Sequence, residues 1–210
     1  PPAPGAAAAP AAPRLAAVMN AALATADAHA KQLRKLELPG GGRVVWQQIE
    51  TQPDHLIQAL GDSDLDLVYL YCHARGGVGD PEKTKPPMLE FSDKAKTYRY
   101  AAAELQMVWR RRPLVIVNGC STAAFTPDAL SPFIEKFTRD CEAGGVIGTE
   151  IPVHEDLAVE FITRLLARVL AGEAVGAALL AVRRELLAED NPLGLAYTLY
   201  AFSEFRLGAR

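Results

Sequence analysis

Short apolar runs alternate along this chain with amphipathic stretches, and this alternation constrains the fold more than any other feature. Three runs are mostly apolar and bounded by Gly, Pro or charged residues: LDLVYLYC (65–72), PLVIVNGC (113–120) and GGVIGTE (144–150). Runs of this length are typical of strands buried on both faces of a parallel sheet. RVVWQQIE (43–50) has one polar face and predicts a further strand. In the second run we expect Val115, Ile116 and Val117 to be inaccessible.

Helical patterns occupy the stretches between these runs, at 24–37, 53–60, 100–110, 129–141, 155–171 and 173–189. The clearest has an apolar stripe at four-residue spacing, made by Leu157, Phe161, Leu165 and Val169. Alternating strands and helices predict an α/β sandwich, with helices on both faces of a mainly parallel sheet. LAAVMN (15–20) is ambiguous because its alanines suit a helix equally well. Arg110 to Arg112 are interpreted as a helix end and a solvated face.

Composition limits the classes of partner. The chain has 210 residues and a formal net charge of −3, which favours neither nucleic acid nor an anionic membrane as a partner. No apolar run is long enough to cross a membrane, and the first residues lack the charged-then-apolar pattern of a secretory signal, so we expect neither. Three cysteines suit a reducing, cytoplasmic location better than a disulfide framework.

The chain divides into two parts. Residues 1–13 contain only Pro, Ala and Gly and are interpreted as a tether. Residues 14–210 are long enough for one domain with a full core. Because the first residue is Pro1 and not Met, we expect the sequence to be a segment of a longer protein.

Two reactive residues follow directly on predicted strands. VYLYC leads into His73, and VIVNG leads into Cys120. If the strands are neighbours, both side chains lie at the carboxyl edge of the sheet, where an imidazole could activate a thiol. The histidine precedes the cysteine by roughly 50 residues, as in caspases. The alternative is that each residue merely packs at a strand end.

Four segments, DLVYLYCHARGG, LVIVNGCSTAAF, GGVIGTEIPVHEDLAVEF and NPLGLAYTLYAF, resemble the CHAT domain of the caspase and separase peptidase group. The resemblance runs from about Arg14 to Phe205. It implies a caspase-like three-layer sandwich whose first strand is LAAVMN. It also implies a cysteine endopeptidase without a cofactor, with His73 as general base and Cys120 as nucleophile. CHAT domains are bacterial and are often joined to sensor or repeat domains that switch the protease on, frequently in defence against phage.

The oxyanion hole is expected to use the backbone N–H groups of Ala74 and Cys120. The family usually has Gly where this chain has Ala74, and a position that required positive φ would strain an alanine. A zinc site would need Cys72 and Cys141 to join His73 and Cys120. No pair of these has the close CxxC spacing usual for zinc, so we expect no metal.

Acidic residues near the expected site predict a pocket for substrate Arg or Lys. Glu150 and Asp156 flank the loop after the third run, and Glu90 and Asp93 are a second source of negative charge. The alternative for the first pair is helix capping. The other histidines, His29, His55 and His154, are interpreted as surface residues.

Two further functional classes were compared with the peptidase. A non-catalytic module could keep the fold and bind a partner peptide along the sheet edge. A Rossmann-like enzyme would need a glycine-rich turn after the first strand, where this chain has NAALATAD, so that class is largely excluded.

Overall fold

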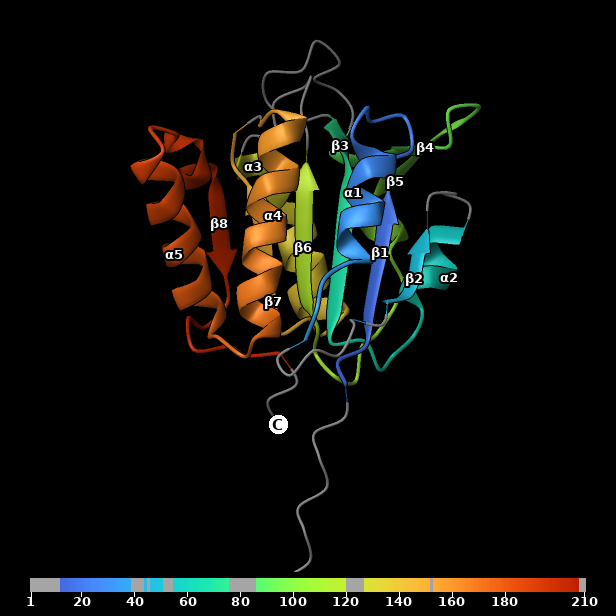
Figure 1. Cartoon of the computed structure of the whole chain (residues 1–210). Helices are drawn as coiled ribbons and strands as arrows, with labels where there is room; N and C mark the ends of the chain where they lie inside the picture. The colour runs from blue at the N-terminus through green and yellow to red at the C-terminus, as the bar shows by residue number, and fades with distance from the viewer. Residues whose placement is uncertain are drawn as a thin grey trace, which may run out of the picture.

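A mixed β-sheet forms the centre of the molecule (Figure 1). The computed structural model describes residues 12–38, 44, 46–50, 55–75, 86–119, 127–151 and 153–207. Within these ranges the sheet has eight strands. They are β1 (Leu15–Met19), β2 (Trp46–Glu50), β3 (Leu67–Arg75), β4 (Met88–Ser92), β5 (Thr97–Ala101), β6 (Leu114–Gly119), β7 (Gly145–Thr149) and β8 (Tyr197–Tyr200).

The sheet runs in the order β2-β1-β3-β6-β7-β8, and the hairpin β4–β5 branches from the end of β3. The pairs from β2 to β7 are parallel. The pairs that involve β4, β5 and β8 are antiparallel. The expected mainly parallel sheet is therefore confirmed in part: the five consecutive strands from β2 to β7 are parallel, and the other three pair antiparallel.

Helices cover both faces of the sheet, as predicted. They are α1 (Ala26–Leu33), α2 (Leu56–Leu60), α3 (Pro127–Glu135), α4 (Glu155–Leu170) and α5 (Val175–Ala188), and α3 continues as a π-helical turn over Lys136–Asp140. The side chains of α1, α4 and α5 form one apolar cluster with the sheet, and those of α2 and α3 form another on the opposite face. Figure 1 shows α1 and α4 in front of the sheet.

The central strand β6 is buried on both sides. Ile116 belongs to the cluster beneath α4, while Val115 and Val117 belong to the cluster beneath α3, and none of the three is more than 1% exposed. LAAVMN forms β1, against its helix propensity, because its backbone pairs with β2 and β3 and its side chains are buried on both faces of the sheet. Gly172 ends α4 with φ of +87°, a conformation that glycine adopts without strain.

The predicted helix at 100–110 is wrong. This segment contains the last residues of β5, a short 3₁₀ turn over Ala102–Glu104 and an extended return to the sheet. Trp109 holds the return in place: its indole N–H donates to the carbonyl of Leu60 over 2.9 Å, and its backbone N–H donates to Cys141. The tether proposed at 1–13 lies almost wholly outside the described residues.

Among the described residues, no helix combines the length and apolar character needed to span a membrane.

Candidate active site at the carboxyl edge of the sheet

The strands that precede the two reactive residues are direct neighbours. β3 and β6 pair in parallel from Leu67↔Leu114 to Cys72↔Gly119. His73 is the next residue of β3, and Cys120 is the next residue in sequence after β6. Cys120 itself lies outside the described residues. The carboxyl ends of both strands lie at the top of the sheet in Figure 1.

The side chain of His73 is half-buried and lies on the face covered by α1 and α4, because strand residues alternate between faces. Cys72 and Ala74 point to the opposite face and are buried in the cluster beneath α3. This placement agrees with a packing role for Cys72. Ala74 lies within β3, outside the set of residues with positive φ, so the alanine at this position carries no such strain.

Glu90 lies directly opposite His73 across the β3–β4 pair. Its side chain is only 7% exposed, and its Oε2 accepts a hydrogen bond from Arg99 Nε over 2.8 Å. Arg99 lies opposite Glu90 on β5. The carboxylate is therefore engaged inside the hairpin, which argues against its use as a substrate pocket.

Asn20 attaches the hairpin to the end of β1. Its amide Nδ2 donates to the carbonyl of Glu90 over 3.2 Å, and its Oδ1 accepts from the N–H of Ser92 over 3.1 Å. Asn20 is 1% exposed, and its own N–H donates to the carbonyl of Tyr71. One buried amide thus connects β1, β3 and β4 at the edge that carries His73.

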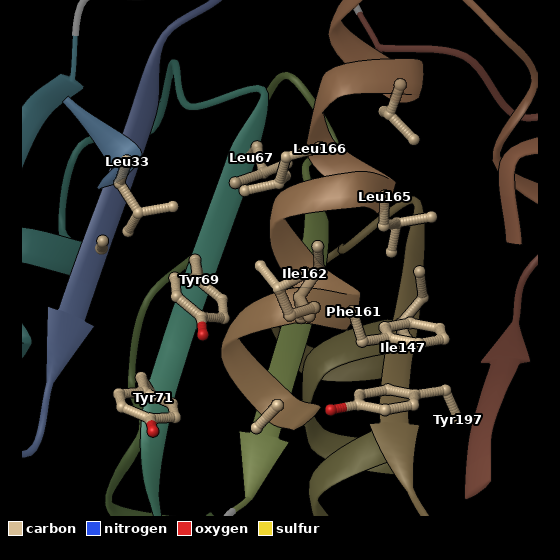
Figure 2. Packing of buried hydrophobic residues seen from close by; sticks show 14 of the residues in the cluster. Leu33, Leu67, Tyr69, Tyr71, Ile147, Phe161, Ile162, Leu165, Leu166 and Tyr197 are labelled. Carbon is tan, nitrogen blue, oxygen red and sulfur yellow. The ribbon is translucent and has the colours of Figure 1, made fainter. Parts of the chain in front are cut away.

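A second buried amide, Asn118, lies on β6 two residues before Cys120. Its Nδ2 donates to Tyr69 Oη over 2.8 Å and to the carbonyl of Ala158 over 3.0 Å, and its Oδ1 accepts from Tyr197 Oη over 2.7 Å. These bonds join β6 to β3, α4 and β8. Figure 2 shows the two tyrosines on either side of α4. The ring of Tyr197 stacks on that of Phe161, with 3.6 Å between the ring centroids.

Neither asparagine was assigned a role from the sequence. Each is a polar residue that ends an apolar run, in LAAVMN and in LVIVNG, and each is almost fully buried. A buried amide must satisfy its hydrogen bonds locally, so a polar residue in this position is the signal that could have identified both.

The prediction that His29 lies at the surface is wrong. It belongs to α1 and is fully buried on the side of this helix that faces the sheet, with its Nε2 2.8 Å from Tyr69 Oη. Burial lowers the pKa of His29 to about 4, so the ring is neutral near pH 7. His55 and His154 are exposed, as predicted.

The predicted acidic residues differ in their surroundings. Asp93 lies in the β4–β5 turn, where the N–H groups of Lys96 and Ala95 hold its pKa below the usual value. Glu150 accepts a hydrogen bond from Tyr200 Oη over 2.8 Å. Burial, with help from this carboxylate, raises the pKa of Tyr200 to about 12.

Asp156 is exposed in the first turn of α4 and lines a hollow of about 470 Å³ between α1 and α4. Its neighbour Glu155 bonds to the other helix: its Oε2 accepts hydrogen bonds from the N–H and the hydroxyl of Thr25, at the start of α1. Of the predicted acids, Asp156 is therefore the one whose carboxylate is presented to solvent beside a hollow.

No cluster of metal-binding side chains occurs within the part of the chain that the structure describes. Cys141 is buried beneath Leu105 and Met107, and burial raises the pKa of its thiol.

Comparison with solved structures identifies the architecture. The Saccharomyces cerevisiae separase in the separase–securin complex matches over 90% of this chain and 12% of its own, with a TM-score of 0.51 at 13% identity. This likeness concerns the fold. The chain therefore has a caspase-like α/β fold.

The chain belongs to the CHAT domain family, whose model matches residues 4–203. A protein of Vitiosangium sp. (strain GDMCC 1.1324), named a probable protease, is 34% identical over 167 residues. The match covers 76% of this chain and 21% of that relative, so the chain spans about a fifth of the relative's length.

Proposed function

We propose that this chain is a cysteine endopeptidase domain in which His73 activates Cys120. The observation that carries the proposal is the register of β3 and β6, which pairs Cys72 with Gly119, the residues immediately before His73 and Cys120. A register continued by one residue would bring the imidazole and the thiol to the same face of the sheet. Membership of the CHAT family and the relative named as a protease support the same chemistry.

In the proposed reaction, the S–H bond of Cys120 breaks and its proton passes to His73, leaving the electron pair on sulfur. The thiolate attacks the carbonyl carbon of the substrate, and the imidazolium then returns the proton to the leaving amine. Water hydrolyses the resulting thioester with His73 again as base. Net, one peptide bond and one water give an acid and an amine.

The proposed oxyanion hole uses the N–H groups of Ala74 and Cys120. Successive N–H groups of a strand point to opposite edges. The carbonyl of Tyr71 faces β1, where it accepts from the N–H of Asn20 over 2.7 Å. Three residues later the alternation directs the N–H of Ala74 toward β6. This direction supports the use of Ala74 in place of the glycine usual in the family.

We further propose a protein substrate and control by parts of a longer protein, because the related protease is about five times longer than the matched region. In this proposal residues 14–210 form the peptidase domain, residues 1–13 tether it, and the protein acts in the cytoplasm of a bacterium, with defence against phage as one setting. Asp156, with Glu150 and Asp93 as further candidates, would contact a basic substrate side chain.

Alkylation of Cys120 by iodoacetamide at pH 7, quantified by peptide mapping, tests the dyad without knowledge of the substrate. We expect rapid labelling of Cys120 that His73→Ala slows strongly, while the exposed-site control His55→Ala leaves it unchanged. On a cleavable peptide, Cys120→Ala should abolish hydrolysis and His73→Ala should reduce it by at least ~10²-fold. Labelling that is slow and independent of His73 would favour the non-catalytic binding module. Full cleavage by Cys120→Ala would refute the peptidase mechanism.

A further inference from the structure

A row of three polar side chains crosses the strands beside the candidate site. His73 on β3 lies opposite Glu90 on β4, and Glu90 lies opposite Arg99 on β5. Directly opposite residues in antiparallel strands project from the same face, with their Cβ atoms about 5 Å apart. The row therefore places an imidazole, a carboxylate and a guanidinium in sequence on the face covered by α1 and α4.

The carboxylate of Glu90, in the middle of the row, is buried, and a buried charge requires hydrogen-bond donors or an opposite charge beside it. The Glu90 side chain is 7% exposed, whereas that of Arg99 is 49% exposed. Arg99 Nε engages Oε2 of Glu90 over 2.8 Å. A carboxylate has about four acceptor positions, so Glu90 can accept from an imidazole N–H in addition to Arg99 Nε.

The strand that carries Glu90 is fixed independently of Arg99. Asn20 bonds the backbone of Glu90 and of Ser92, and the carbonyl of Ser92 accepts from the N–H of Ala21 over 2.8 Å. Leu89 and Phe91, on either side of Glu90, are buried in the cluster on the opposite face of the sheet. The carboxylate is thereby held at a constant position relative to β3.

We infer that Glu90 is a positioning residue for His73, and that Arg99 partly neutralises the charge of Glu90 without being needed to hold it in place. The inference rests on the proposed function. The ionised carboxylate accepts a hydrogen bond from one ring nitrogen of His73, so that the other nitrogen receives the thiol proton of Cys120. Glu90 takes up no proton. It stabilises the imidazolium that forms, as an anion close to a developing cation does.

Two substitutions distinguish this role from a structural one because they act in opposite directions. Glu90→Gln keeps the shape of the side chain and removes the charge that stabilises the imidazolium. The imidazolium that protonates the leaving amine should lose its proton at lower pH, so the alkaline limb of the pH profile for peptide hydrolysis should move about one unit down. The rate of Cys120 alkylation at pH 7 should fall about 10-fold, because less of the thiol passes its proton to His73. Arg99→Gln keeps the carboxylate and removes its competing cation, so the same limb should move up.

The matched control is Glu104→Gln, which makes the same carboxylate-to-amide change on an exposed residue just after β5. It should leave the rate and both limbs as in the unmodified chain. If Glu90→Gln does not fold, the direction in which the alkaline limb moves in Arg99→Gln is enough to test the inference. A profile unchanged in Glu90→Gln, or one that moves down in Arg99→Gln, overturns the inference while alkylation still depends on His73. If His73→Ala does not slow the alkylation of Cys120, the proposed function is overturned instead.

Discussion

At the scale of single residues, His29 couples the stability of the fold to pH. The ring is fully buried between α1 and the sheet, edge-on to both Tyr69 and Tyr71. Burial lowers its pKa from 6.5 to about 4. As pH falls, the unfolded chain therefore binds a proton at this residue before the folded chain does. The contribution of His29 to stability is complete above about pH 6.5 and is lost as pH falls toward 4.

We expect the free energy of unfolding to fall by about 2–3 kcal/mol between pH 7 and pH 4 through this residue. His29→Phe, which keeps a ring of similar size but cannot titrate, should remove that part of the pH dependence. The control His154→Gln changes an exposed histidine and should preserve it. Urea unfolding at a series of pH values measures the difference. Equal pH dependence in His29→Phe and the unmodified chain would contradict this account.

At the scale of elements, the run Arg110 to Arg112 shows how neighbouring residues acquire different roles. Arg110 and Arg112 are exposed, as predicted from the sequence. Arg111 is not: its side chain is 17% exposed and its Nε lies 2.9 Å from Oδ1 of Asp66, whose side chain is 3% exposed. The other oxygen of Asp66 accepts from the N–H of Arg14 over 2.8 Å. This cluster joins the starts of β1, β3 and β6.

Arg111→Ala should therefore destabilise the fold by about 2–3 kcal/mol, because it leaves a buried carboxylate with a single backbone donor. Arg110→Ala is the matched control. The guanidinium of Arg110 is 73% exposed and pairs with Asp64 over 3.2 Å, an exposed pair that contributes about 1 kcal/mol or less. The denaturant midpoints of the two variants test this ranking. If Arg110→Ala is the less stable of the two, the ion pair of Arg111 with Asp66 does not stabilise the fold as described.

Most elements could be predicted because their periodicity and their burial agree. The stripe of α4 and the apolar runs of β3, β6 and β7 all lie where the pattern places them. The segment at 100–110 could not, because AAAELQMVW has high helix propensity and tertiary contacts overrule it. Trp109 is fully buried against Phe137, and the return that it anchors leaves no room for a helix. β8 was missed because it has only four residues, Tyr197–Tyr200, and directly follows a 3₁₀ turn.

At the scale of the whole molecule, parallel strands explain why part of the site was predictable. Residues after parallel strands meet at one edge of a sheet, so His73 and Cys120 could be assigned to a common edge without coordinates. The surroundings of His73 could not be assigned. The register of β4 and β5 places Glu90 and Arg99 beside it, and Asn20, just after β1, bonds to the backbone of β4. A shift of one residue in that register would turn Glu90 to the opposite face.

The same edge of the sheet leads to a prediction about substrate preference. Asp156 lies in the first turn of α4, which covers the face that carries His73, and its carboxylate is exposed beside the hollow between α1 and α4. If a substrate side chain occupies this hollow, a cation would pair with Asp156, and Arg would do so through two parallel hydrogen bonds. We therefore expect cleavage after Arg or Lys.

Asp156→Asn should lower kcat/KM for Arg substrates by about 10-fold to 10²-fold, the loss expected when a charged hydrogen bond is removed. It should leave substrates with Ala before the cut unaffected. Asp140→Asn is the matched control, because it makes the same change on an exposed aspartate that pairs with Lys136 and is not among the residues that line the hollow. Peptide-library profiling of the three proteins measures both effects. A preference for Ala, Gly or Ser that neither substitution changes would leave Asp156 with helix capping alone, since an exposed carboxylate in the first turn of α4 also stabilises the positive end of the helix dipole.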